Sequence, residues 1–148
     1  MDRIAKRFQE LTTEELYQIL KLRQDVFILE QKCFYPDLDA CDQRALHVWL
    51  QDEGGIAAYL RILDRGEKSP HVSMGRIIAA RRGCGLGAEI VRQGLLAAKE
   101  VYGADTVCLE AQLYARGFYE KLGFRAISEP FDEDGITHIK MLCEIRQE

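Results

Sequence analysis

The stretch GRIIAARRGCGLGAEIVRQGLLAA, residues 75–98, decides the fold because it combines three local patterns. Residues 76–79 form a short apolar run with strand character, residues 82–87 form a glycine-rich turn, and from Leu86 the apolar residues recur at helical spacing. The stretch therefore predicts a strand, a loop and a helix in that order. The helix is expected to bury one face, made of Leu86, Ile90, Val91, Leu95, Ala98, Val101 and Tyr102.

The loop in this stretch has the features of a phosphate or pyrophosphate site. Gly83, Gly85 and Gly87 leave backbone N–H groups uncovered by any Cβ, and the following helix adds the positive end of its dipole. No Asp or Glu occurs at positions 69–87, whereas the basic residues at or near the loop are Lys68, Arg76, Arg81 and Arg82. We expect a bound anion here, although charge clustering alone would fit a solvated basic turn equally well.

The glycine spacing is compatible with two kinds of nucleotide. Residues 83–88 fit the dinucleotide pattern G-x-G-x-x-A, with Asp105 placed where an acidic ribose ligand would be sought. Residues 82–87 fit R-x-x-G-x-G, which resembles the acetyl-CoA-binding loop of the GNAT superfamily of N-acetyltransferases. The Walker pattern is absent, because no Gly-Lys-Ser/Thr follows the glycines.

Length and composition describe an ordinary globular domain. The 148 residues are 47% hydrophobic, which predicts a single domain, 1–148, with a substantial core. A net charge of −4 and a pI near 5.5 argue against general binding to nucleic acid or to an anionic membrane. No stretch resembles a signal peptide or a membrane span, so we expect a cytoplasmic protein.

The cysteines indicate neither a disulfide framework nor a metal site. There are five of them, and no two form a C-x-x-C pair. Cys108 and Cys143 lie in apolar runs and are expected in the core. Cys84 lies in the glycine loop beside a helix N-terminus, which lowers a thiol pKa, so a nucleophilic role is an alternative, although no histidine is placed in a motif with it.

The rest of the chain predicts an α/β (α+β) fold with a mostly antiparallel sheet, one parallel β-α-β crossover and helices on both faces. Thr12 and Glu15 form a capping box that starts the first helix. This order is not the alternating series of a dinucleotide-binding fold, which weakens that alternative. The expected elements are a strand at 4–11, a helix at 13–31, a hairpin at 45–51 and 56–63, a strand at 106–111, a helix at 114–122 and a hairpin at 124–131 and 136–145.

Four segments in this order resemble the GNAT superfamily over nearly the whole chain, and within it an ElaA-type group. They are residues 16–39, 82–87 (RGCGLG), 111–124 (AQLYARGFYEKLGF) and 133–141 (EDGITHIKM). The resemblance implies acetyl-CoA as cosubstrate, with its pyrophosphate on the loop amides and its pantetheine arm along the central strand. The residues implied are Ile77, Ile78, Arg82, Gly83, Cys84, Gly85, Leu86 and Gly87.

Tyr119 matches the general acid of the family. When an amine attacks a thioester, the departing thiolate gains a proton, and a phenol with a reference pKa of about 10 can supply it. On spacing alone, Tyr119 would be a packing residue on a helix that also carries Phe118 and Leu122. The attacking amine must lose a proton, and Glu110 is the first candidate base and Glu30 the second.

These features predict direct transfer of an acetyl group from acetyl-CoA to a primary amine on a small molecule or peptide. The alternative is a non-catalytic CoA-binding regulatory module, because Tyr119 is a single residue and the connection from strand to loop is shorter than usual in the family. His47 and His138 are expected as half-buried strand residues. A free edge on the terminal strand would allow a homodimer. Acidic residues that could attract a cationic amine, or simply form turns, are Asp37, Asp39, Asp42, Glu129, Asp132, Glu133 and Asp134.

Overall fold

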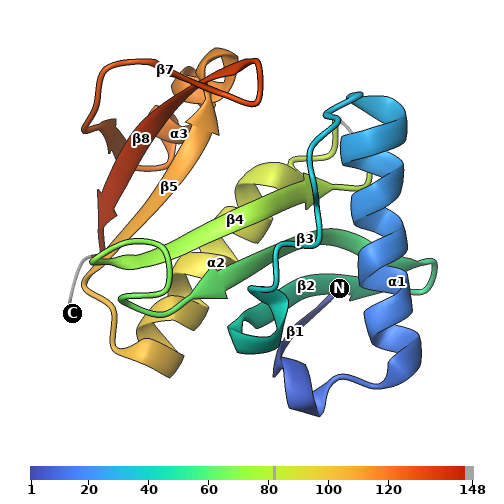
Figure 1. The fold of residues 1–148 in the computed structure, drawn as a ribbon. Coiled ribbons are helices and arrows are strands. Elements are labelled where there is room, and N and C mark those ends of the chain that lie inside the picture. The colour runs from blue at the N-terminus through green and yellow to red at the C-terminus, as the bar shows by residue number, and fades with distance from the viewer. Residues whose placement is uncertain (82, 146–148) are drawn as a thin grey trace.

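The computed structural model describes residues 1–81 and 83–145, in which the strands form a single mixed sheet (Figure 1). The strand order is β1-β2-β3-β4-β5-β8-β6, and β7 also pairs with β8. All pairings are antiparallel except that between β4 and β5. The bounds are β1 Asp2–Arg7, β2 Leu46–Asp52, β3 Gly55–Leu63, β4 Val72–Ala79, β5 Thr106–Gln112, β6 Phe124–Ala126, β7 Phe131–Glu133 and β8 Ile136–Glu144.

The parallel pair is joined by α2, Leu86–Tyr102, as the central stretch predicts. The two strands pair only at one end, where Val72 is opposite Val107 and Ser73 is opposite Cys108. Beyond this point β4 continues to Ala79 without further pairing to β5. The divergence opens the sheet at its centre.

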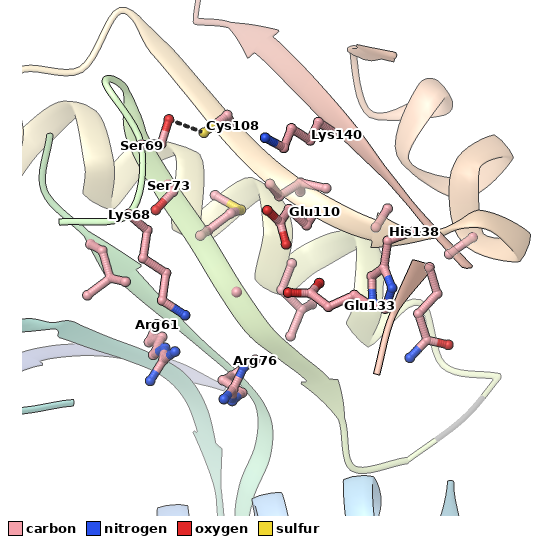
Figure 2. A pocket seen from close by; sticks show the side chains of 18 of the residues that line it. Arg61, Lys68, Ser69, Ser73, Arg76, Cys108, Glu110, Glu133, His138 and Lys140 are labelled. Carbon is pink, nitrogen blue, oxygen red and sulfur yellow. Dashed lines mark hydrogen bonds between the residues drawn. The ribbon is translucent and has the colours of Figure 1, made fainter. Parts of the chain in front are cut away.

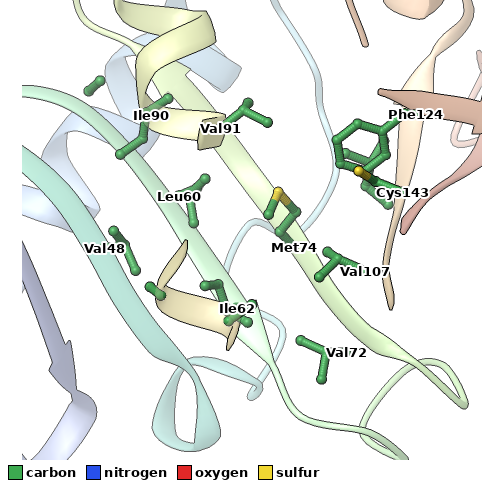
Figure 3. Close-up of a cluster of buried hydrophobic side chains, with 14 of the residues drawn as sticks. Val48, Leu60, Ile62, Val72, Met74, Ile90, Val91, Val107, Phe124 and Cys143 are labelled. Atoms are coloured by element: carbon green, nitrogen blue, oxygen red, sulfur yellow. The ribbon is translucent and has the colours of Figure 1, made fainter. Parts of the chain in front are cut away.

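Helices cover both faces of the sheet (Figure 1). On one face, α2 packs on the main core, where Figure 3 shows Ile90 and Val91 above Leu60 and Met74. At Gly94 an added Cβ would lie 2.6 Å from Leu60 Cδ2, so helix and strand approach more closely than alanine allows. The predicted apolar face is confirmed except at Val101, which is 39% exposed near the end of the helix.

The opposite face is covered by α1, Thr13–Arg23, which starts at the predicted capping box of Thr12 and Glu15. Ile19 of this helix packs with Trp49 and Tyr59 in a second, smaller apolar cluster. The helical region extends to Glu30 as expected, but Gln24–Glu30 is π-helical. Such widened turns are rare and occur frequently at functional sites.

The C-terminal region differs from the expected hairpin. Its first arm is divided into β6 and β7, and Pro130 in the connection has no N–H to donate to a ladder. Both short strands pair with β8, whose other side pairs with β5. β8 is therefore an interior strand, and the free edge assumed for the terminal strand is instead on β1 and on β6 and β7.

Other element boundaries differ from expectation by a few residues. The first strand ends at Arg7 rather than at position 11, because Phe8–Glu10 forms a 3₁₀ turn. The short helix near Tyr119 consists of a 3₁₀ turn, Leu113–Ala115, followed by α3, Arg116–Lys121. Within residues 1–81 and 83–145, no helix has both the length and the apolar character of a membrane span.

Candidate active site

A cleft of about 610 Å³ lies where β4 and β5 separate. Its floor includes Gly75 and Ile77 of β4 and Glu110 of β5, and α3 contributes Tyr119 at its margin. At Gly75 an added Cβ would meet no atom within 4 Å, so the space beside this part of the floor is open. The cleft reaches both faces of the sheet through this separation: Glu110 and Cys108 point away from the main core, whereas Leu109 and Ile77, which also line the cleft, pack with that core.

A backbone bulge shapes the floor. Arg76 has a left-handed backbone, with φ of 52°, and the register between β3 and β4 shifts between Tyr59 and Arg61. A non-glycine residue in this conformation is strained, and such strain is concentrated at functional sites. The bulge lies in the part of β4 that no longer pairs with β5.

The glycine loop forms the entrance to α2 as predicted. Gly83 and Gly85 have φ of 75° and 72°, which L-residues with a Cβ rarely adopt. Gly85 is the N-cap of α2 and has no side chain to cap the helix, so the first turn of the helix offers backbone N–H groups of the kind that bind an anion. Gly87 is small for another reason, because an added Cβ would lie 3.3 Å from Phe118 Cζ. Arg82 lies outside the described residues.

Three of the basic residues that were expected to favour an anion at this loop form ion pairs with aspartates instead. Lys68 and Arg76 form ion pairs with Asp39 and Asp37, respectively, on the other side of the cleft. Arg81 forms an ion pair with Asp52 at the end of β2. The expectation that Lys68 and Arg76 attract an anion to the loop is therefore wrong. The feature of the loop that favours an anion is its backbone N–H groups.

Ile77 and Ile78 lie on opposite faces of β4. Ile77 lines the cleft and packs against the main core. Ile78 is 2% exposed and packs with Trp49 and Tyr59 in the cluster under α1. A cosubstrate arm along β4 could therefore contact the side chain of Ile77, whereas Ile78 can contribute only its backbone.

Tyr119 lies in an aromatic group at the cleft. Its ring meets Phe118 and Phe124 edge-on, with ring centroids 5.0 and 5.8 Å away. Burial, with a smaller contribution from Tyr114, raises the pKa of Tyr119 to about 12. The phenol therefore stays protonated at physiological pH and can act as a hydrogen-bond donor. It is both a packing residue and a cleft-lining group, so the two interpretations of its sequence position do not exclude each other.

An acidic group lies on the β5 side of the cleft, around Glu110 (Figure 2). Burial and the nearby Glu133 carboxylate raise the pKa of Glu110, and Lys140 and His138 oppose the shift. Lys140 is directly opposite Glu110 on β8. Glu30, the other candidate base, is exposed at the end of the π-helical segment, whose Phe27 lines the cleft.

On the β3 side, a buried ionic network holds two arginines around one carboxylate. Arg23 Nη1 and Arg61 Nη1 both donate to Asp42 Oδ1, at 2.7 and 2.9 Å. The two guanidinium side chains are 0% and 2% exposed. Burial alone would lower the pKa of Arg23, but the hydrogen bond to Asp42 raises it above its ordinary value. Burial would raise the pKa of Asp42, but hydrogen bonds from Arg23 and Arg61 in turn lower it, which favours the charged form of the carboxylate.

The network extends to the rim of the cleft through two further aspartates. Asp37 accepts hydrogen bonds from Arg23 Nε at 2.9 Å and from Arg76 Nε at 2.7 Å. Lys68 Nζ donates to Asp39 Oδ2 at 3.0 Å. Burial would raise the pKa of Asp39, but hydrogen bonds from Arg61 and Lys68 hold it well below its usual range. Asp37, Asp39 and Asp42 are therefore neutralised by cations and do not form the attractive surface for an amine that the sequence suggested.

Two expectations about single residues are corrected by the structure. His47 is fully buried rather than half-buried, with Nδ1 2.8 Å from Tyr59 Oη and Nε2 3.0 Å from the Asp42 carbonyl oxygen. Cys108 is half-buried at the cleft, where its thiol donates to Ser69 Oγ at 3.1 Å. Cys143 lies in the core, as expected. His138 is half-buried, also as expected, and lines the cleft.

The sequence did not identify several polar residues as lining the cleft, among them Arg61, Lys68, His138 and Lys140. The alternation along β8 contained a usable pattern for two of them, since Ile139 and Met141 face the core and the neighbouring His138 and Lys140 face outward. No local pattern identifies Arg61, which lies within an apolar run.

Comparison with known proteins is consistent with this geometry. The model of the acetyltransferase (GNAT) domain family matches residues 9–145. The chain belongs to the GNAT acetyltransferase family. This GNAT domain is 36% identical to the protein ElaA of Escherichia coli over 144 residues, which are 93% of each chain. It is 35% identical over 146 residues to a UPF0039 protein of Schizosaccharomyces pombe, which are 96% of each chain.

Solved structures show the same relationship. An acyl-CoA N-acyltransferase from Pseudomonas aeruginosa superposes on this GNAT chain with a TM-score of 0.89 and 35% identity, covering 97% of this chain and 99% of the other. The crystal structure of E. coli ElaA gives a TM-score of 0.88 and 32% identity with the same coverage. Acyl transfer from an acyl-CoA is the class of activity that this family membership supports.

Proposed function

We propose that the protein is an N-acetyltransferase that transfers an acetyl group from acetyl-CoA directly to a primary amine. The observation that carries the proposal is the divergence of β4 from β5 together with a glycine-rich loop that ends at Gly85, the N-cap of α2. The open edge of β4 offers N–H and C=O groups to the amide-bearing arm of the cosubstrate. The loop at residues 83–87 offers amides to its pyrophosphate. The cleft runs beside β4 and is lined by Tyr119 and Glu110.

In this proposal Glu110 receives a proton from the amine. Its raised pKa makes it a stronger base than an ordinary glutamate once it is ionised. The amine nitrogen then bonds to the thioester carbonyl carbon and the C–S bond breaks, so one proton leaves the nitrogen and the sulfur accepts one. A backbone N–H on β4 polarises the carbonyl, as fixed donors do in other acyl transfers.

Tyr119 is proposed as the acid that meets the departing sulfur. With a pKa of about 12 against a reference of about 8.5 for a thiol, complete proton transfer in isolation would be uphill by about 5 kcal/mol. Burial of the sulfur in the cleft reduces this difference, because it raises the pKa of the thiol as well. The proton is therefore shared with the sulfur while the C–S bond breaks.

Tyr119→Phe tests this role. Phenylalanine keeps the edge-on contacts with Phe118 and Phe124, so we expect an unchanged melting temperature. Loss of the acid should lower kcat by about 10²-fold or more. The measurement is CoA release from acetyl-CoA with an amine acceptor. Tyr17→Phe is the matched control, because Tyr17 is 63% exposed on α1 and does not line the cleft. Full turnover by Tyr119→Phe at every pH would show that the phenol is not the acid.

A binding experiment tests the function as a whole. We expect CoA and acetyl-CoA to raise the melting temperature and NAD to leave it unchanged. Stabilisation by NAD alone would overturn the assignment. Stabilisation by CoA without transfer to any amine would instead favour a non-catalytic CoA-binding module.

A further inference from the structure

The cleft has opposite charges at its two sides, arranged across neighbouring strands. Arg61 on β3 pairs with Gly75 on β4, and Glu110 on β5 pairs with Lys140 on β8. Gly75 and Glu110 each lie two residues beyond the paired Ser73 and Cys108, so they occupy corresponding positions on the diverging strands. Neighbouring strands are about 4.8 Å apart, which places the backbones of Arg61 and Glu110 about 10 Å apart or more.

The β3 side of the cleft has an excess of positive charge. Four cations, Arg23, Arg61, Lys68 and Arg76, face three carboxylates, Asp37, Asp39 and Asp42, which leaves one uncompensated positive charge. Arg61 is nearly buried, and its Nε has no hydrogen-bond partner within the described part of the chain. Lys68 is the adaptable member, because its side chain is 47% exposed and forms its ion pair at the cleft rim.

The β5 side has the opposite excess. Glu110, Glu133 and Asp134 line the cleft there, with Lys140 as the cation beside them. Figure 2 shows Arg61, Lys68 and Arg76 on one side of β4 and Glu110, Glu133 and His138 on the other. Between the two groups Gly75 leaves open space above the strand. A molecule lying across Gly75 would therefore have one end near carboxylates and the other near a lysine.

We propose that the acceptor is an amino acid-like amine that carries a carboxylate, bound with its amine at Glu110 and Glu133 and its carboxylate toward Lys68. This inference rests on the proposed acetyl transfer and specifies the acceptor class for it. Arg61 and Arg76 use their Nη groups on aspartates, so they contribute the positive field rather than a direct contact. Lys68 supplies the direct contact by turning from Asp39 to the carboxylate.

A polyamine would fit this arrangement poorly. One of its ammonium groups would be favoured beside Glu110 and Glu133, but the second would extend across Gly75 toward Lys68. Like charges disfavour that position, and this is the kind of repulsion by which a site rejects a related molecule. The same cleft thus selects for a negative group and against a second positive one.

Matched acceptors test the inference. Glycine, β-alanine and 4-aminobutyrate are each compared with the corresponding primary amide and with 1,4-diaminobutane, using CoA release and product mass as readouts. We expect the acids to have kcat/KM values about tenfold or more above those of their amides, because only the acids can form a charge-assisted hydrogen bond with Lys68. Comparing kcat/KM among the three acids, which differ in length, identifies the separation between amine and carboxylate that spans Gly75.

The Lys68→Met variant separates recognition from folding. It should raise KM for the best acid about tenfold, because the contact with the carboxylate is lost. It should lower KM for 1,4-diaminobutane, because the Lys68 charge that repels the second ammonium group is removed. Lys68→Arg should restore the preference for the acid. Lys21→Met is the control, since Lys21 is 56% exposed and also forms an ion pair with an aspartate, at 2.7 Å, away from the cleft. A purely structural role for Lys68 would not move the two KM values in opposite directions.

The outcomes distinguish this inference from the proposed function. Efficient transfer to the amides or to 1,4-diaminobutane, with no preference for the acids, would overturn the inference and leave the acetyltransferase intact. If no amine is acetylated, the same molecules are tested by thermal shift with CoA present. If the acids stabilise the wild type but not Lys68→Met, the inferred binding of a carboxylate is supported and the proposed acetyl transfer is contradicted. If the acids do not stabilise the wild type, both proposals are overturned.

Discussion

The two faces of the central sheet are held together by different physical interactions. Beneath α2, the sheet packs through apolar side chains such as Leu60 and Ile90, and the closest approach is made by Gly94. On the α1 face, the small apolar cluster adjoins buried ions, with Arg23 and Arg61 sharing Asp42. The first face stabilises the fold by excluding water. The second holds charges in place beside the cleft, which is the arrangement a binding site needs.

Removing one ion from the α1 face should have the largest effect on stability. Asp42→Ala leaves Arg23 and Arg61 buried with one carboxylate fewer, and breaking a buried pair in this way costs about 3–5 kcal/mol. Urea denaturation measures the loss. Asp25→Ala, which breaks the exposed ion pair with Lys21, should cost about 0.5 kcal/mol or less. Equal losses in the two variants would show that the buried network is not what holds this face.

The corresponding test on the α2 face is a double-mutant cycle. Leu60→Ala should cost about 3 kcal/mol through lost burial and the cavity it leaves. Gly94→Ala should cost about 1 kcal/mol, because its new Cβ would lie 2.6 Å from Leu60 Cδ2. Together they should cost less than the sum, since the added methyl group occupies the space that Leu60 vacates. Strict additivity in urea denaturation would mean that helix and strand do not meet there as tightly as the structure indicates.

The sequence predicted the two faces unequally. The apolar face of α2 and the alternation of the strands repeat with regular periods, so the sheet class, the crossover and most of the core followed from them. The glycine-rich loop before α2 was also predicted, and the structure adds that Gly83 and Gly85 have a positive φ that few other residues adopt. The resemblance to the GNAT superfamily, drawn from four short segments, is confirmed over residues 9–145.

The charged face could not be derived in the same way. Asp37 and Asp42 lie in a stretch with the composition of a turn, and their partner Arg23 is 14 and 19 residues earlier in the chain. Arg61 lies in an apolar run that predicts only a buried strand. No short-range rule pairs residues at such separations, and ion pairs form wherever the tertiary fold brings opposite charges together. The assignment of Lys68 and Arg76 to the glycine loop was wrong for this reason.

A smaller effect, in the dependence of stability on pH, should also separate the two faces. His47 lies on the charged face, and burial, together with the nearby Arg23 and Arg61, lowers its pKa although Asp42 opposes the shift. The Asp42 carbonyl can only accept, so Nε2 carries the proton and Nδ1 accepts from the Tyr59 hydroxyl. The native state therefore favours the neutral ring. The unfolded chain binds a proton near pH 6.5, so stability is complete above that pH and falls as the pH decreases toward the lower native pKa.

The expected loss is up to about 1 kcal/mol between pH 6.5 and 5.5, because one proton gives at most about 1.4 kcal/mol per pH unit. Urea denaturation at half-unit pH steps measures it. His47→Gln should be less stable at pH 7.5 but should lose this slope, whereas His71→Gln should keep it, because His71 is exposed. Glu110, whose pKa is raised, adds a slope of the opposite sign in every variant, so the difference between the wild-type and His47→Gln curves isolates His47. Parallel curves would mean that the imidazole gains a proton in the folded protein as readily as in the unfolded chain, and that this part of the charged face is open to water.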